Sequence, residues 1–163
     1  MCKPRFGLLL VLLSCMVVTG GSTFPSIPQL HGAWKLVHSS LAGRDTTIIN
    51  SSPQPGLVIF TERHYSLMYV EGSAPRVPFA DPARPTDAER LRAYDTFVGH
   101  SGSYSVVDSI IQMHIVIAKH PSMMGTELRT SFAQFAYRIL ADTLWLTRRT
   151  GPGSFTMKLT RAE

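Results

Sequence analysis

Cysteine is scarce in this chain and occurs only at its start. The 163 residues include two cysteines, Cys2 and Cys15. A domain formed by the residues that follow cannot be held by an internal disulfide or by a cysteine-based metal site. This excludes the zinc-finger, thioredoxin-like and disulfide-scaffold classes.

Charged residues are also few, and they do not cluster. They make up 17% of the chain, and 16 lysines and arginines stand against 11 acidic residues. Long runs of like charge, which are typical of nucleic-acid-binding tails, do not occur. The sequence therefore predicts no nucleic-acid partner, and its hydrophobic fraction of 44% suits one globular domain.

The common catalytic motifs are missing as well. The sequence contains no nucleophile elbow, phosphate-binding glycine loop, zinc-protease helix or dinucleotide fingerprint. Its histidines are dispersed over separate segments, at His31, His38, His64, His100, His114 and His120. The sequence thus predicts no metal and no cofactor, and it favours a binding protein over an enzyme.

The N-terminus has the pattern of a secretory signal peptide. Lys3 and Arg5 precede an apolar run from Phe6 to Val18, and small residues follow at 19–23. Such a run is too short for a permanent transmembrane helix. We expect residues 1–22 to be removed, which leaves residues 23–163 as a secreted or periplasmic domain without an integral membrane span.

Two alternatives to this processing remain open. Leu12-Leu13-Ser14-Cys15 approximates a bacterial lipoprotein processing site, in which Cys15 would carry the lipid and anchor the protein to a membrane. The apolar residues after Cys15 continue the run rather than begin a polar tether. The other alternative is an uncleaved anchor.

Short alternating segments separated by turn residues dominate the remainder. The pattern predicts strands at 33–38, 57–60, 64–70, 103–107, 110–118, 128–139, 143–149 and 154–161. About eight antiparallel strands suit a closed barrel, because closure pairs the edges that an open sheet would expose. A barrel of this size has room inside for side chains or for one small ligand.

One helix is expected between the strands. Prolines at 75, 78, 82 and 85 exclude a sheet interior, so residues 72–84 are expected to form a loop. Thr86 or Asp87 then caps a predicted helix over 88–97, which ends near Gly99. We expect this helix to pack across one mouth of the barrel.

Several motifs carry a family resemblance. Gly32-Ala33-Trp34 resembles the Gly-x-Trp element of lipocalins, and the segments 32–37, 55–61, 65–67, 102–106 and 125–132 are similar in order and spacing to the bacterial lipocalin-like domain family. The resemblance implies a cup-shaped, all-β closed antiparallel barrel and a small apolar ligand. It also implies that Trp34 closes the barrel base beneath a basic residue of the last strand, Arg161 or, less favourably, Arg149.

The strand at 110–118 can turn only one of its faces into the barrel. One face holds Ile111, Met113, Ile115 and Ile117, and the other holds Gln112, His114 and Val116. We expect the polar face to point inward, which would place Gln112 and His114 against a ligand. The alternative for His114 is a hydrogen bond to a neighbouring strand or to solvent.

Three further residues are candidate ligand contacts. Arg129 offers a bidentate partner to a carboxylate, although a salt bridge to Glu127 or Asp95 competes with that role. Tyr104 offers a phenol to the cavity, and Met68 an adaptable apolar lining, although both residue types are also common in cores.

These observations predict a secreted or envelope protein that binds a small hydrophobic or amphiphilic molecule in its barrel. One alternative is an isomerase or cyclase of a small metabolite that uses His114 as acid or base. A second is an envelope interaction protein whose barrel is filled by side chains. The sequence leaves the ligand's identity and the oligomeric state open.

Overall fold

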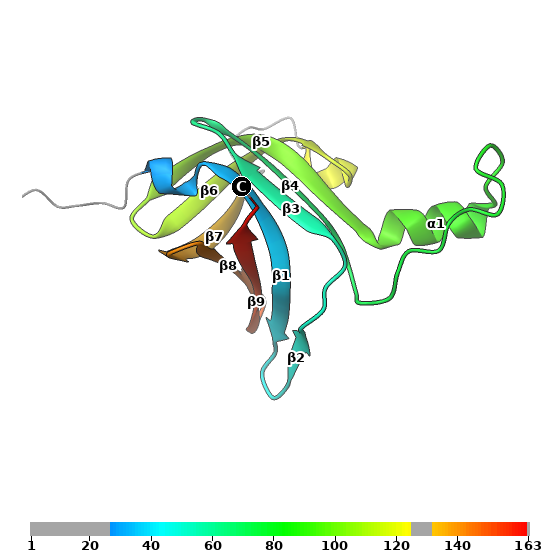
Figure 1. Cartoon of the computed structure of the whole chain (residues 1–163), viewed down its shortest axis with the longest axis horizontal. Helices are drawn as coiled ribbons and strands as arrows, with labels where there is room; N and C mark the ends of the chain where they lie inside the picture. Colours follow the sequence, from blue (N-terminus) through cyan, green and yellow to red (C-terminus); the bar gives the residue numbers. More distant parts are fainter. Residues whose placement is uncertain (1–26, 125–131, 163) are drawn as a thin grey trace, which may run out of the picture.

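The computed structural model describes residues 27–124 and 132–162. Nine strands, one α-helix and two short 3-10 helices follow one another in these residues (Figure 1). Their bounds are η1 Ile27–Leu30, β1 Gly32–Ala42, β2 Thr47–Asn50, β3 Gly56–Phe60, β4 His64–Val70, α1 Asp87–Asp95, β5 Phe97–Val107, β6 Ile110–Ala118, η2 Pro121–Met123, β7 Phe132–Leu140, β8 Thr143–Thr150 and β9 Gly153–Arg161.

The strands form a closed antiparallel barrel, as the sequence predicts. The order is β2-β1-β3-β4-β5-β6-β7-β8-β9, and an additional pairing of β1 with β9 closes the ring. β1 and β3 to β9 are the eight barrel strands, and β2 is an extra short strand paired with the second half of β1. Because β3 pairs only with the first half of β1, β2 and β3 follow one another along the same edge of β1.

Alternating apolar residues fill the inside of the barrel. Leu144 and Leu146 of β8 and Leu159 of β9 are completely buried. The large side chains with almost no exposed surface are Trp34, Phe60, Leu30, Leu67, Ile111, Met113, Leu144, Leu146, Met157 and Leu159. These residues belong to one continuous core. The alternating apolar residues of the sequence are therefore the ones on the inward face of the strands.

The expected orientation of the strand at 110–118 is wrong. Ile111, Met113 and Ile115 are buried in the core, whereas Gln112 and His114 are half-buried on the opposite face of β6. The apolar face is turned inward because the interior at this level is packed with side chains, and a polar imidazole would lose its hydration there.

A β-bulge between β5 and β6 then shifts the register at the end of β6. Ser101 pairs with Ile117 and Gly102 with Ile115, which leaves Val116 unpaired with β5. Val116 and Ile117 are both exposed as a result. Gly102 allows this close approach, since a Cβ at its position would overlap the His114 carbonyl oxygen.

One end of the barrel is closed around Trp34. Its indole is fully buried and donates from Nε1 to the Leu30 carbonyl over 2.7 Å. The Arg161 guanidinium lies 4.3 Å from the centre of the indole ring and donates to the carbonyls of His31 and Gln29. We call this end the base.

Gly32 makes room for the guanidinium of Arg161 at the base. Its φ angle is +117°, and a Cβ at this position would lie 3.0 Å from Arg161 Nη1. Both the backbone conformation and the close approach therefore require glycine two residues before Trp34.

Residues 71–96, which we call the arm, extend away from the barrel between β4 and β5 (Figure 1). Thr86 caps α1, and its side chain and Glu89 form a capping box, as the position of Thr86 predicts. Lys119 binds the end of the helix, donating to the Tyr94 carbonyl over 2.7 Å.

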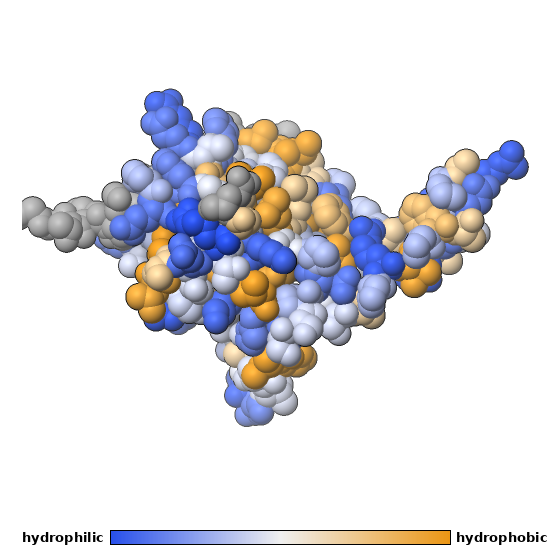
Figure 2. Space-filling model, viewed as in Figure 1, coloured by the Kyte–Doolittle hydropathy of each residue, from blue (hydrophilic) through white to orange (hydrophobic). Residues whose placement is uncertain are grey.

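The helix does not pack across a barrel mouth as expected. None of the α1 residues is buried, and Leu91 and Tyr94 are 61% and 42% exposed. Figure 2 shows apolar side chains on the surface of the arm. The helix is stabilised locally by its cap rather than by an apolar face against the sheet.

Candidate functional site

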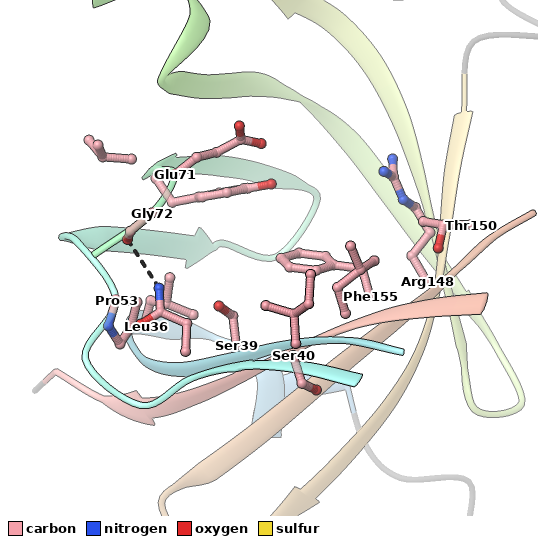
Figure 3. Close-up of a pocket in the computed structure, with 14 residues that line it drawn as sticks. Leu36, Ser39, Ser40, Pro53, Glu71, Gly72, Arg148, Thr150 and Phe155 are labelled. Carbon is pink, nitrogen blue, oxygen red and sulfur yellow. Dashed lines mark hydrogen bonds between the residues drawn. The ribbon is translucent and has the colours of Figure 1, made fainter. Parts of the chain in front are cut away.

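A cavity of about 410 Å³ opens at the end of the barrel away from Trp34 (Figure 3). We call it the mouth cavity. It is lined by Leu36, Ser39, Ser40, Leu41, Ile48, Asn50, Pro53, Tyr69, Val70, Glu71, Gly72, Arg148, Thr150 and Phe155. Its volume falls in the range of about 300–1,000 Å³ that is usual for small-molecule sites.

The hairpin of β1 and β2 forms one wall of the mouth cavity. A register shift between Leu36 and His38 inserts one extra residue into β1 opposite β9. Ser39 and Leu41 therefore follow Leu36 on the inner face, and Ile48 of β2 pairs with Leu41. Because of this extra residue, apolar side chains lie on the inner face of the hairpin as far as the rim of the cavity.

Side-chain amides hold this wall against the start of the arm. Asn50 Nδ2 donates to the Gly72 carbonyl over 3.1 Å, and Gln54 Nε2 donates to the Ser73 carbonyl over 2.8 Å. The dashed line at Gly72 in Figure 3 marks the Asn50 bond. The opening of the cavity therefore lies between β2 and the segment that follows β4. The two hydrogen bonds hold these segments together at its edge.

An aromatic pair lines the cavity below the rim. The rings of Tyr69 and Phe155 stack with their centroids 6.1 Å apart and their planes 23° from parallel. Burial and the Glu71 carboxylate raise the pKa of Tyr69 to about 12, against a smaller opposing effect of Arg148. The Tyr69 phenol is therefore neutral at physiological pH.

Arg148 brings a positive charge to the inner face of β8. It shares that face with the buried Leu144 and Leu146, four and two residues earlier in the strand. Its guanidinium carbon lies 6.0 Å from the centre of the Phe135 ring. In Figure 3, Arg148 and Glu71 lie on opposite sides of the mouth cavity.

A buried polar pair is formed by one side chain of β4 and one of β5. Tyr65 Oη and His100 Nδ1 share a hydrogen bond of 2.8 Å, and only 3% and 6% of these residues are exposed. Burial, and to a smaller extent the Arg148 charge, lower the pKa of His100 to about 4. His100 is therefore neutral at physiological pH, and burial also raises the pKa of Tyr65.

The candidate ligand residues that the structure describes do not line the mouth cavity. Gln112 and His114 lie on the outer face of β6. Tyr104 is buried, and its hydroxyl donates to the Thr61 carbonyl over 2.8 Å. Met68 is 40% exposed on the outer face of β4, and Arg129 lies outside the described residues.

The sequence reasoning missed the residues that line the cavity. For Arg148 a signal was present, because Leu144, Leu146 and Arg148 alternate along one strand and must share a face. For Leu41 and Ile48 no such signal existed, since the bulge that sets their orientation leaves no mark in the apolar pattern. His100 is likewise buried through its pairing with Leu67, not through a local motif.

Metal-binding clusters and membrane-spanning helices are both absent from the described residues. Within residues 27–124 and 132–162, no group of three His, Cys, Asp or Glu side chains is placed to hold a metal ion. None of the helices in these residues has the length and apolar character needed to cross a membrane.

The comparisons with known proteins concern the whole barrel. The structure is similar to that of a lipocalin-like protein from Bacteroides uniformis, with 14% identity, a TM-score of 0.42, and 81% of this chain and 97% of that chain covered. An uncharacterized protein from Bacteroides eggerthii gives 10% identity, a TM-score of 0.42, and coverage of 79% and 98%. No curated protein matches the sequence. The family model of the lipocalin-like domain matches residues 31–160, so the chain belongs to the lipocalin-like domain family.

Proposed function

We propose that this protein is exported and binds a small hydrophobic or amphiphilic molecule in its mouth cavity. The supporting observation is that apolar side chains line the cavity yet stay in contact with water. Leu41 and Ile48 are 43% and 66% exposed, and both lie on the inner face of the β1–β2 hairpin. Exposed apolar surface inside a concave site is stabilised when an apolar ligand covers it.

The position of the cavity also limits the size of the ligand. From the base up to Leu36 and Leu67, buried side chains of the described residues fill the barrel, which leaves the space near the rim for a ligand. A ligand would sit between the aromatic pair and the rim, with one side toward solvent. This favours a compact molecule or one end of a longer one.

Binding can be tested with an uncharged fluorescent probe such as N-phenyl-1-naphthylamine. Ile48→Gln should weaken its binding about tenfold, because the ligand would then cover a polar amide instead of an apolar side chain. Ile49→Gln is the matched control, since Ile49 is 64% exposed on the other face of the same strand. The affinities are measured by fluorescence titration.

The control variant should bind like the wild type. Equal losses in both variants would show that the probe does not use the inner face of the hairpin. A wild-type protein that binds no probe would leave the filled-barrel interaction protein as the better interpretation.

Export predicts a defined mature chain. Cleavage after residues 20–22 would leave a protein without cysteine, because Cys2 and Cys15 both precede that point. Intact-mass measurement of the protein expressed in a bacterial host checks this prediction. A mass that includes Cys15 with attached acyl chains would instead establish the lipoprotein alternative.

A further inference from the structure

Arg148 is placed to select the charge of a ligand. Its position on the inner face of β8 follows from Leu144 and Leu146, and it is itself exposed at the mouth. Arg149, the next residue, is also exposed but belongs to the outer face. Two adjacent arginines therefore differ mainly in whether they line the mouth cavity.

The Arg148 charge has no ion-pair partner among residues 27–124 and 132–162. The ion pairs in those residues are Arg90 with Asp87 and Arg161 with Asp142. Glu71 is the carboxylate that lines the cavity with Arg148, and it lies beyond ion-pair distance on the opposite side. An anion inside the cavity could therefore approach the guanidinium without displacing a carboxylate of these described residues from it.

The Arg148 charge affects the pKa values of neighbouring titratable groups. Arg148 favours the neutral form of the buried His100 imidazole, and Glu71 has no comparable effect on it. At Tyr69 both charges act, and they oppose each other.

Resting on the proposed function, we propose that the ligand is an anionic amphiphile whose head group pairs with Arg148. Its apolar part would lie over Phe155 and against Leu41 and Ile48, the exposed apolar residues on the inner face of the hairpin wall. A guanidinium forms two parallel hydrogen bonds with a carboxylate, sulfate or phosphate group. A cationic amphiphile would meet repulsion at the same place, and a neutral one would leave the charge unpaired.

The proposal can be tested with ligands that share one alkyl chain. Decanoate, decanol and decyltrimethylammonium are titrated below their micelle-forming concentrations, with displacement of N-phenyl-1-naphthylamine as the readout. The wild type should bind decanoate about tenfold or more tightly than decanol, and decyltrimethylammonium most weakly. Arg148→Gln should abolish the preference for decanoate while retaining decanol and the neutral probe.

Two further variants make the test specific. Arg149→Gln removes the same charge from the adjacent outward position and should keep the preference for decanoate. Arg148→Lys keeps the positive charge and should keep most of the preference for decanoate. Retained binding of the neutral probe by Arg148→Gln shows that this variant is folded and that its cavity is intact.

The outcomes separate this proposal from the proposed function. Probe binding with equal affinities for decanoate and decanol would overturn the selection of an anion but leave ligand binding in place. Equal losses in Arg148→Gln and Arg149→Gln would also overturn it, because they would indicate general surface charge. Failure of the wild type to bind the neutral probe would reject the proposed function itself.

Discussion

His100 is a histidine held neutral inside the barrel. Its ring packs against Tyr65 with the centroids 5.5 Å apart, and a hydrogen bond joins the two side chains. Because its pKa is lowered to about 4, the folded state binds a proton less readily than the unfolded chain, whose histidines titrate near about 6.5. Protonation at acid pH therefore favours unfolding.

The sign of this effect gives a pH prediction. The contribution of neutral His100 to the free energy of unfolding is fully present above about pH 6.5. It is lost progressively as the pH falls toward about 4, by an amount on the order of 3 kcal/mol. His100→Gln should reduce this dependence, since an amide does not titrate there. Urea unfolding at several pH values measures it, with the exposed His64→Gln as the control. Parallel curves for the wild type and His100→Gln would contradict the assignment.

At the scale of single residues, the sequence predicts some neighbours and misses others. Trp34 and Arg161 stand in register on β1 and β9, which is the arrangement that the family resemblance implies. The inward direction of Arg148 follows from simple alternation along β8. The burial of His100 depends instead on strand pairing across 30 or more residues, and a single sequence does not specify that pairing.

The pairing of β1 with β9 closes the barrel, and Trp34 lies at the base end of the paired strands. Trp34→Ala should destabilise the protein by about 3–5 kcal/mol, because it removes a fully buried aromatic side chain and leaves a cavity. Trp145→Ala is the matched control: the Trp145 indole is partly exposed on the outer face, with Arg138 4.0 Å from its ring centre. Urea unfolding of both variants decides the question.

The control should lose much less stability, about 1 kcal/mol, as partly exposed positions generally do. If Trp34→Ala unfolded at nearly the wild-type urea concentration, the indole would have no closing role at the base. A loss of similar size in both variants would mean that burial at the base adds nothing beyond ordinary packing of an aromatic ring.

Strands as elements were predictable where the alternation is uninterrupted. Residues 143–149 and 154–161 read directly as β8 and β9. The first strand is predicted only over 33–38, but β1 continues to Ala42 because a bulge keeps it paired with β9. The mouth cavity depends on this extension and on β2, so the wall of the site was beyond what local pattern could indicate.

For the molecule as a whole, topology was the easier part to anticipate. About eight alternating segments in a single domain leave few arrangements that pair every edge, and a closed barrel is one of them. The side chains that face the cavity are harder to predict, because two one-residue shifts, in β1 and in β6, change which residues point inward. Each shift reverses the alternation beyond it.

The arm has a consequence for how the chain tolerates change. Its two ends are adjacent, since Val70 pairs with Phe97 and the Glu71 amide donates to the Thr96 carbonyl over 2.8 Å. Beyond Ser73, whose carbonyl fastens the cavity wall, the arm contributes no buried core residue. Loop length costs little free energy, so insertions and deletions at residues 74–95 would leave the register of β4 and β5 unchanged. Related chains can therefore diverge in length here while keeping the same barrel.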